Sequence, residues 1–464
     1  MTRFDPSQLA AWTGGRWTAP PVSPLLGFGI DSRQLGAGQV FVALRTEQRD
    51  GHEFLAAAEN ACAAAALVSS PNPTLQLPQL VVADPLAAFQ AIARAHRAVF
   101  PGRVVGISGS AGKTSTKNLL ALLLGGEGAV LATEGNLNNH LGVPLTLTRL
   151  DPERHRFAVV EAGISGPGEM APLAEMISPE VSIITLVAPA HVAGLGSVEG
   201  VAREKAVLSA HTRDGGVAIF PQQCAAFAAF AGLGGSRLVL TRVDALPSGP
   251  AKEGCVPYAI SHRDHETVLT LAWRGEPRAV TLRRVSDGMA QNAALAISAA
   301  LWLGVDTALI QPRLAGWVAA GLRGEWRREA GRLLYVDCYN ANPAAMADAL
   351  DAFYAQAPAE APRLLVLGGM EELGAEAAMF HRALGRALQV RPQDRVFAIG
   401  EHAAALRAGA LDGGVAAAQI AVVDTLEPVR SALADFAGSV FLKGSRRHRL
   451  EALLETVKEE PAHV

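Results

Sequence analysis

Short apolar runs and helix-periodic stretches alternate along the chain, separated by glycine-rich or polar turns. In the first hundred residues, Gln39–Leu44 and Ala66–Val68 predict strands, whereas Glu53–Ala65 and Leu86–Phe100 predict helices. This alternation favours an α/β fold, in which helices cover the faces of mostly parallel sheets.

The middle of the chain carries runs typical of strands that are buried on both faces. Phe157–Val160 and Val181–Val187 are such runs, and Gln291–Leu303 predicts an apolar helix. The pattern in Leu208–Leu271 is weaker, and short strands such as Val217–Phe220 and Leu238–Leu240 are predicted there. We assign no chemistry to that segment.

The last part of the chain repeats a strand–helix alternation that predicts a doubly wound, mostly parallel sheet. Its five predicted strands are Leu333–Asp337, Leu364–Gly368, Val396–Gly400, Ala421–Val423 and Val440–Lys443. Polar, glycine-bearing loops follow three of these strands and predict a ligand-binding edge.

Length and composition predict a multidomain enzyme that needs no disulfides. The 464 residues suit two to four domains, which we place at 1–99, 100–325 and 326–464. A net charge of −3 gives no electrostatic case for binding nucleic acid or an anionic membrane. The four cysteines are scattered, the first residues do not resemble a signal peptide, and no apolar run is long enough to insert in a membrane. We expect a cytoplasmic protein.

Val104–Leu124 reads as an apolar strand, a glycine-rich turn and an apolar-periodic helix. Glycines let such a turn bring its N–H groups close to an anion, and the helix N-terminus adds positive potential. Lys113 can reach the β- and γ-phosphates of a nucleotide, and Thr114 can offer a hydroxyl to Mg²⁺. The spacing G-x-x-G-x-x-G-K-T misses the strict motif by one position. The stretch predicts a nucleoside triphosphate site.

Polar side chains follow the two buried strands of the middle unit. Glu161 ends the first strand and can help to hold Mg²⁺, whereas His191 follows the second. Parallel strands bring such positions to one edge of a sheet. A surface glutamate and a structural histidine are the competing interpretations, and Asn138 and Asn139 suit either a turn or a ligand-binding loop.

Seven motifs in order resemble those of the Mur ligase family: ISGSAGKTSTK, TEGNLNNHLGVPLT, VEAGISGPGEM, APAHVAGLGSVEGVAREK, DCYNANP, LGGMEELG and LKGS. The N-terminal DSRQLGAGQVFVALRTEQRDGHEF also fits, so the resemblance covers nearly the whole chain. It implies an N-terminal domain that holds the UDP end of a substrate, a central ATPase domain and a C-terminal Rossmann-like domain. The YNANP and EELG stretches point to the branch that adds D-alanyl-D-alanine to UDP-N-acetylmuramoyl-tripeptide through an acyl phosphate.

The resemblance also implies roles for single residues. ATP and Mg²⁺ are the implied cofactors, and Lys113, His191 and Lys205 are the implied catalytic residues. The implied ATP-binding residues are Gly109, Ser110, Ala111, Gly112, Lys113, Thr114, Ser115, Asn292, Arg323, Asp337, Asn340 and Asn342. The implied metal-binding residues are Thr114, Glu161, His191 and Lys205, the last at a position that related ligases carbamylate. The implied substrate-binding residues are Ser32, Arg33, Asp50, His52, Asn138 and Asn139.

Four positions depart from the family pattern. Leu186 stands for the usual asparagine, Gly369 for an aspartate, Gly288 for a histidine, and Leu322 for the glycine that precedes Arg323. These changes leave the phosphate and metal residues intact and bear on the adenine and domain-closure contacts.

Two alternative functions remain open at the level of sequence. One is a related amide ligase acting on another acid, of the folate-polyglutamate or cyanophycin type. The other is a phosphate-loop NTPase with a regulatory binding role. We expect a monomer with no nucleic-acid partner.

Overall fold

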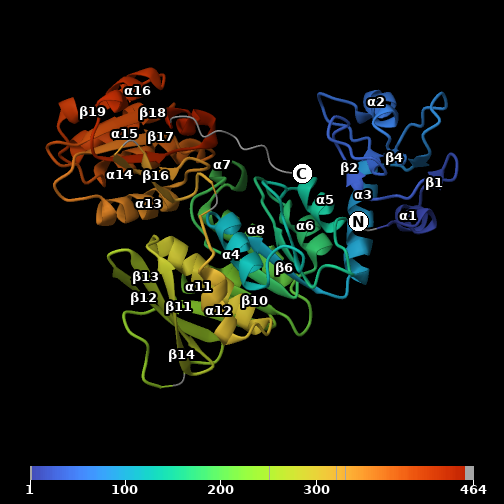
Figure 1. Cartoon of the computed structure of the whole chain (residues 1–464), viewed down its shortest axis with the longest axis horizontal. Coiled ribbons are helices and arrows are strands. Elements are labelled where there is room, and N and C mark those ends of the chain that lie inside the picture. The colour runs from blue at the N-terminus through green and yellow to red at the C-terminus, as the bar shows by residue number, and fades with distance from the viewer. Residues whose placement is uncertain (1–2, 250, 320, 330, 455–464) are drawn as a thin grey trace.

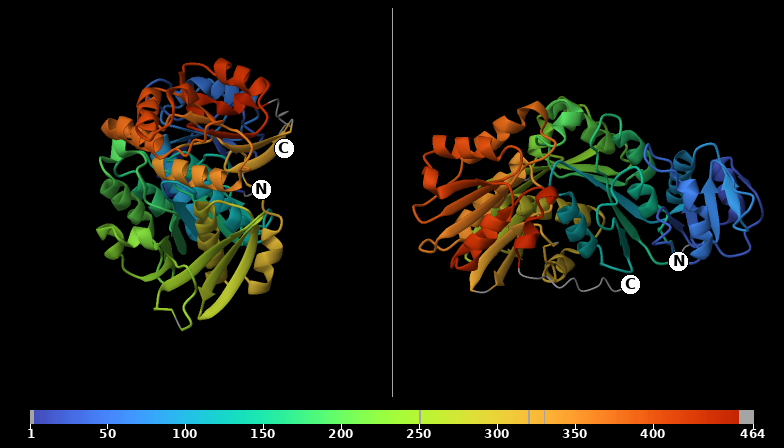
Figure 2. Two further views of the ribbon diagram at one scale, coloured as in Figure 1. Left: turned by 90° about the vertical axis from the view of Figure 1, so that its left-hand side faces the viewer. Right: turned by 90° about the horizontal axis from the view of Figure 1, so that it is seen from above.

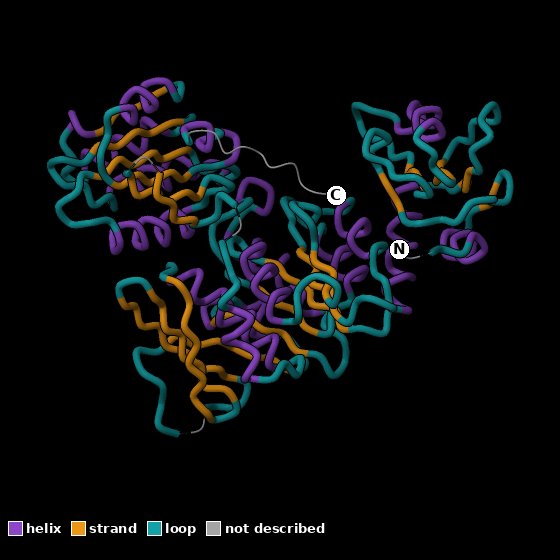
Figure 3. Tube along the Cα trace, viewed as in Figure 1, coloured by secondary structure: helices purple, strands orange, loops and turns teal. Residues whose placement is uncertain are grey.

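Three β-sheets, each covered by helices, follow one another along the chain in the computed structural model (Figure 1). The structure describes residues 3–249, 251–319, 321–329 and 331–454. The first and third sheets lie on opposite sides of the central one, and the three units form a row when seen from above (Figure 2). Helices and strands alternate in the Cα trace (Figure 3), so the predicted α/β class is confirmed. No helix within the described ranges is long and apolar enough to cross a membrane.

The first sheet has five strands in the order β1-β5-β4-β3-β2, parallel except for the β1–β5 pair. Its strands are β1 (Arg16–Trp17), β2 (Phe28–Gly29), β3 (Val40–Val42), β4 (Ala65–Val68) and β5 (Gln79–Val81). Its helical elements are α1 (Pro6–Thr13), η1 (Gly51–Phe54), α2 (Leu55–Asn60) and α3 (Pro85–Val99). The helix predicted over Glu53–Ala65 is too long, because Cys62 has a left-handed φ of 61° and Ala65 begins β4.

The central sheet has nine strands in the order β14-β13-β12-β11-β10-β9-β6-β8-β7. They are β6 (Arg103–Ser108), β7 (Val130–Ala132), β8 (Phe157–Glu161), β9 (Val181–Ile184), β10 (Val217–Pro221), β11 (Ser236–Arg242), β12 (Cys255–Arg263), β13 (Glu266–Trp273) and β14 (Glu276–Arg283). Strands β6 to β12 all pair in parallel with their neighbours in this group. Beyond them, β13 pairs antiparallel with β12, and β14 pairs antiparallel with β13.

Helices cover both faces of the central sheet because its middle strands are apolar on both sides. The helices are α4 (Lys113–Leu123), α5 (Gly142–Leu147), α6 (Met170–Ile177), α7 (Val192–Leu195), α8 (Val198–Ala210), α9 (Gln222–Ala225), α10 (Ala228–Ala231), α11 (Asp287–Trp302) and α12 (Thr307–Leu314). On β6, Val105 and Ile107 join the core under α4 and α11, whereas Val104 faces the core formed with α6 and α8. Because β6 is buried on both faces of the sheet, the position of the loop that follows it is fixed.

The third sheet has six strands in the order β15-β16-β20-β17-β18-β19, parallel except for β15 and β16. They are β15 (Glu325–Glu329), β16 (Arg332–Asp337), β17 (Arg363–Gly368), β18 (Arg395–Ile399), β19 (Ile420–Val423) and β20 (Ser439–Lys443). The helical elements are α13 (Pro343–Gln356), η2 (Gly374–Glu376), α14 (Ala377–Arg386), α15 (Ala403–Asp412), η3 (Ala417–Gln419), α16 (Glu427–Ala434), η4 (Arg446–His448) and η5 (Leu450–Leu453). The doubly wound, mostly parallel sheet is confirmed.

The strand predicted over Val181–Val187 is three residues too long. β9 ends at Ile184, because the next residues turn aside to hold the glycine-rich loop. The Ser110 N–H donates to the Leu186 carbonyl at 2.9 Å, and the Thr185 N–H donates to the Ser108 carbonyl at 2.9 Å. The backbone beyond β9 therefore supports the loop instead of extending the sheet.

A buried ion pair joins the first unit to the central sheet. Arg97, in the last turn of α3, donates through Nη2 to both carboxylate oxygens of Glu180, at 2.9 and 2.8 Å. Glu180 also accepts the Val104 N–H of β6 at 2.7 Å. The Arg97 side chain is only 1% exposed. Loss of one partner would leave a buried charge without compensation.

We expect Glu180→Ala to lower the free energy of unfolding by about 3–5 kcal/mol, because Arg97 would stay buried without its carboxylate. Chemical denaturation measures this. Glu175→Ala is the matched control, since Glu175 pairs with Arg94 between the neighbouring α6 and α3 but both side chains are half exposed. That control should cost less than about 1 kcal/mol. Equal losses in the two variants would contradict the assignment.

Candidate active site

The glycine-rich loop between β6 and α4 is held in one conformation by its neighbours. Gly109 and Gly112 have positive φ angles of 147° and 82°. A β-carbon at Gly112 would lie 2.5 Å from Asn292 Oδ1, so a side chain has no room there. Ser110 Oγ donates to the Ala188 carbonyl at 2.9 Å. The loop is therefore shaped before any ligand binds.

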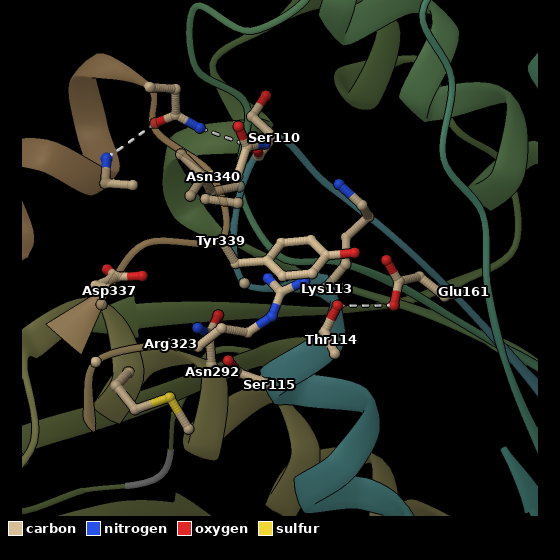
Figure 4. A pocket seen from close by; sticks show the side chains of 18 of the residues that line it. Ser110, Lys113, Thr114, Ser115, Glu161, Asn292, Arg323, Asp337, Tyr339 and Asn340 are labelled. Atoms are coloured by element: carbon tan, nitrogen blue, oxygen red, sulfur yellow. Dashed lines mark hydrogen bonds between the residues drawn. The ribbon is translucent and has the colours of Figure 1, made fainter. Parts of the chain in front are cut away.

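Lys113 and Thr114 open α4 and face a buried carboxylate (Figure 4). Thr114 Oγ1 donates to Glu161 Oε2 at 3.0 Å, and Asn138 Nδ2 donates to Glu161 Oε1 at 2.8 Å. Lys113 Nζ donates to the Gly109 carbonyl at 2.8 Å. Burial lowers the pKa of Lys113, and the Glu161 charge opposes that shift. The predicted juxtaposition of ammonium, hydroxyl and carboxylate is present.

The donors beside the loop suit a hard divalent cation such as Mg²⁺. Glu161 is 2% exposed, and its carboxylate lies within hydrogen-bond distance of the Thr114 hydroxyl. Both are oxygen donors, which Mg²⁺ prefers. Within the ranges that the structure covers, no three His, Cys, Asp or Glu side chains gather as a preformed metal site. Phosphate oxygens and water would have to complete the coordination, as is usual for Mg²⁺.

A cavity of about 660 Å³ opens above the loop, between the central sheet and the third sheet. Most of the predicted nucleotide and metal residues line it, together with both predicted asparagines. These are Ser110, Ala111, Gly112, Lys113, Thr114, Ser115, Asn138, Asn139, Glu161, His191, Asn292, Arg323, Asp337, Asn340 and Asn342. Gly109, in the same loop, is not among the residues that line the cavity.

The third unit contributes its polar loops to the same cavity. Asn342 Nδ2 donates to the Ser110 carbonyl at 3.1 Å and so connects the start of α13 to the glycine-rich loop. Lys443 Nζ, at the end of β20, pairs with Asp337 Oδ2 at 2.6 Å and donates to the Asn340 carbonyl at 3.1 Å. The predicted ligand-binding edge of the third sheet thus faces the phosphate loop.

His191 lies at the start of α7 with a left-handed φ of 56°. This conformation costs a non-glycine residue about 1–2 kcal/mol, so the surrounding contacts must hold it. Its Nδ1 pairs with Glu372 Oε2 of the third unit. The pairing lowers the pKa of the Glu372 carboxyl.

Lys205 lies in α8 and is buried, with 2% of its surface exposed, and it does not line the cavity. Burial lowers its pKa well below the usual value, and the positive charge of Lys113 adds to that effect. Its amine is therefore easier to deprotonate than an exposed lysine's.

The predicted substrate residues of the first unit lie apart from this cavity, on the far side of the central sheet (Figures 1 and 2). Arg33 pairs with Asp31 at 2.7 Å, and hydrogen bonds from the Arg33 side chain and backbone are the main causes that lower the pKa of Asp31 to about 2. Asp50 accepts the His52 N–H at 3.0 Å, which is the main cause of its pKa of about 2. Ser32 follows Asp31 in the same turn.

Sequence patterns missed several side chains that line the cavity. The Arg323 guanidinium carbon lies 3.9 Å from the centre of the Tyr339 ring, which stands inside the DCYNANP motif. Trp317, Trp326 and Tyr335 line the cavity as well. Tyr339 could have been found from the motif. The other three have no local signal, because only the contact between the two units brings them there.

Gly288, which stands where the family pattern has a histidine, is in contact with a carboxylate of the third unit. The Gly288 N–H donates to Asp348 Oδ1 at 2.8 Å, and a β-carbon at Gly288 would lie 2.6 Å from Asp348 Oδ2. Burial raises the pKa of Asp348. The α13 carboxylate thus occupies the space that a side chain at position 288 needs. At Leu186, the backbone carbonyl makes the contact to Ser110, so the changed side chain does not affect it.

The fold and the site define an enzyme of the phosphate-loop class whose cavity is completed by a second domain. The profile of the Mur ligase middle domain matches residues 107–300, and that of the Mur ligase glutamate ligase domain matches residues 322–446. The chain belongs to the Mur ligase family. The resemblance drawn from the motifs is therefore confirmed, as is the prediction of a ligase.

Three relatives match nearly end to end. The UDP-N-acetylmuramoyl-tripeptide–D-alanyl-D-alanine ligase of Escherichia coli K12 is 33% identical over 92% of this chain and 93% of its own. A crystal structure of MurF from Acinetobacter baumannii has a TM-score of 0.85 at 28% identity and covers 98% of both chains. MurF ligase from Thermotoga maritima, solved in complex with ADP, has a TM-score of 0.77 at 25% identity over 92% of this chain and 96% of its own.

We expect Gly112→Ala to raise the dissociation constant for ADP about tenfold or more, measured by calorimetry. The β-carbon would meet Asn292 and must push the loop out of its conformation. Gly126→Ala is the control, because Gly126 has a φ of 71° with nothing within 4 Å of a β-carbon. It carries the same backbone cost of about 1–2 kcal/mol without the clash. Similar ADP affinities in the two variants would argue against a preshaped loop.

Proposed function

We propose that this protein uses ATP to join D-alanyl-D-alanine to UDP-N-acetylmuramoyl-tripeptide, a step of peptidoglycan precursor synthesis. The observation that carries the proposal is the cavity in which the phosphate loop, Glu161 and the loops of the third unit meet. Relatives named for this reaction match the chain over more than nine-tenths of its length, which includes the first unit. That coverage favours this substrate over the acids of the alternative ligases.

The proposed reaction needs two anions to approach each other. The γ-phosphate of ATP must meet the terminal carboxylate of the tripeptide, and phosphorylation gives that poor electrophile a good leaving group. The amine of the dipeptide then attacks the acyl phosphate, which releases phosphate and forms the amide. Lys113 and Arg323 line the cavity as cations that can offset this charge.

The metal ligands are part of the proposal. Thr114 and Glu161 would hold Mg²⁺ at the loop, with His191 and a carbamylated Lys205 serving a second position nearby. When bound, the metal would neutralise charge on the phosphates and on the acyl group. A carbamate would turn the buried Lys205 amine into a carboxylate on a long stem. The lowered pKa of Lys205 supports this, since only a neutral amine adds CO₂.

The first unit is proposed to hold the UDP end of the substrate through Ser32, Arg33, Asp50 and His52. These residues lie at the far side of the central sheet from the third unit, so the ligand would extend along the row of units (Figure 2). Three domains, at 1–99, 100–325 and 326–464, would close around the reactants. We also propose that the protein works in the cytoplasm as a monomer.

We expect phosphate release from ATP to require both UDP-N-acetylmuramoyl-tripeptide and D-alanyl-D-alanine, with one pentapeptide formed per phosphate. Coupled phosphate detection and mass spectrometry measure the two products. Lys113→Ala should remove turnover, because the phosphates would lose the cation at the start of α4, and Lys252→Ala on the exposed surface is the control. ATP hydrolysis that ignores both substrates would instead favour an NTPase of the regulatory kind.

We expect Lys205→Ala to lose nearly all ligase activity, and a short added carboxylate such as acetate to restore part of it. The small acid would occupy the place of the proposed carbamate. Lys252→Ala should show neither loss nor rescue. A Lys205→Ala variant that keeps full activity would show that the buried lysine has only a packing role.

A further inference from the structure

His191 is held by a residue that does not line its cavity. Its Nδ1 pairs with Glu372 Oε2, from the loop after β17 in the third unit. His191 itself belongs to the central unit and lines the cavity beside the phosphate loop. The pair therefore crosses from one unit to the other. Glu372 has no place in the nucleotide, metal or substrate roles proposed above.

The backbone segments that carry His191 and Glu372 also contact each other directly. The Ala193 N–H of α7 donates to the Glu372 carbonyl at 3.3 Å. Gly374 approaches so closely that a β-carbon there would lie 3.2 Å from the Ala193 Cα. His191 and Glu372 both have left-handed backbones, with φ angles of 56° and 63°. A left-handed backbone is unfavourable for a residue other than glycine. The surrounding contacts must therefore hold both members of the pair in this conformation.

The neighbouring Glu371 has different partners from Glu372, although it has the same charge and lies in the same loop. Glu371 pairs with His448 at 3.4 Å and with Arg447 at 3.5 Å, both within the third unit. Within the described residues it forms no ion pair or hydrogen bond with His191. Glu371 therefore forms its ion pairs within the third unit, whereas Glu372 forms its ion pair with the central unit.

The pairing decides which nitrogen of the imidazole can bind a cation. A carboxylate only accepts hydrogen bonds, so Nδ1 must carry the proton that it receives. In the neutral ring, Nε2 then keeps its lone pair, and it forms no hydrogen bond within the described part of the chain. A carboxylate behind a histidine fixes the ring and its tautomer in this way at many metal sites.

We propose that Glu372 is a positioning residue that presents His191 Nε2 to the metal at the phosphate loop. Because Glu372 comes from the third unit, His191 has the correct ring orientation only when that unit is docked on α7. Docking of the third unit is thereby linked to completion of the metal site. The inference rests on the proposed function, since it takes His191 as a metal ligand.

The test measures Mn²⁺ affinity of the full-length protein with ADP bound, by electron paramagnetic resonance, beside kcat and KM in the ligase assay. Glu372→Ala should weaken Mn²⁺ binding and lower kcat by about 10–100-fold, with KM for ATP changed less than threefold. Glu372→Gln should recover most of both, because its amide oxygen still accepts from Nδ1. Glu371→Gln is the matched control and should stay within twofold of the wild type. ADP affinity without metal should be unchanged in all three, which excludes misfolding.

His191→Ala separates failure of this inference from failure of the proposed function. If His191→Ala weakens Mn²⁺ binding and Glu372→Ala does not, the positioning role is wrong and the metal role stands. If neither variant weakens it, His191 is no metal ligand, and both its metal role and the positioning role of Glu372 are wrong, whereas the ligase reaction is tested separately by phosphate release. A Glu372→Gln variant as impaired as Glu372→Ala would also overturn the inference. In the double variant, loss of Glu372 should add nothing to the loss of His191.

Discussion

The site depends on the buried carboxylate of Glu161, which lies near the half-buried ammonium of Lys113 at the edge of the central sheet. Glu161 is 2% exposed, and its two oxygens accept from Thr114 and Asn138. A carboxylate repels a phosphate bound nearby, so the two are stable together only when a cation lies between them. Strand pairing sets its position, because Glu161 lies opposite Ile107 at the end of β6. The sheet therefore sets where the carboxylate, the Thr114 hydroxyl and the glycine-rich loop meet.

The third unit completes the site through a few polar contacts. Asn342 reaches the Ser110 carbonyl, Asp348 accepts the Gly288 N–H, and Glu372 pairs with His191. Each of these contacts joins a loop or helix of one unit to a loop or helix of the other, and such polar contacts can open more easily than an apolar interface. This suits a ligase that must admit three substrates and exclude water while the acyl phosphate exists.

Much of the fold was predictable because buried parallel strands carry strong local patterns. The five strands of the third sheet and the phosphate loop lie where the sequence places them. The antiparallel strands β12, β13 and β14 escaped, because β13 and β14 bury only alternate residues and all three strands begin or end with a charged residue. β15 escaped for the same reason, since its sequence EWRRE has no apolar run. Half-buried strands give a weak signal until their partners are known.

The sequence by itself determined the phosphate loop, the acidic strand end and the order of the units. These features depend on neighbours within a few residues, such as Gly112 beside Lys113 or Glu161 after an apolar run. Tertiary structure alone decided which distant residues share the cavity. Asp348 and Gly288 meet across 60 positions of chain, and no local propensity encodes that contact. Packing of one sheet's loops against another's, a property of the whole fold, placed Glu372 on His191.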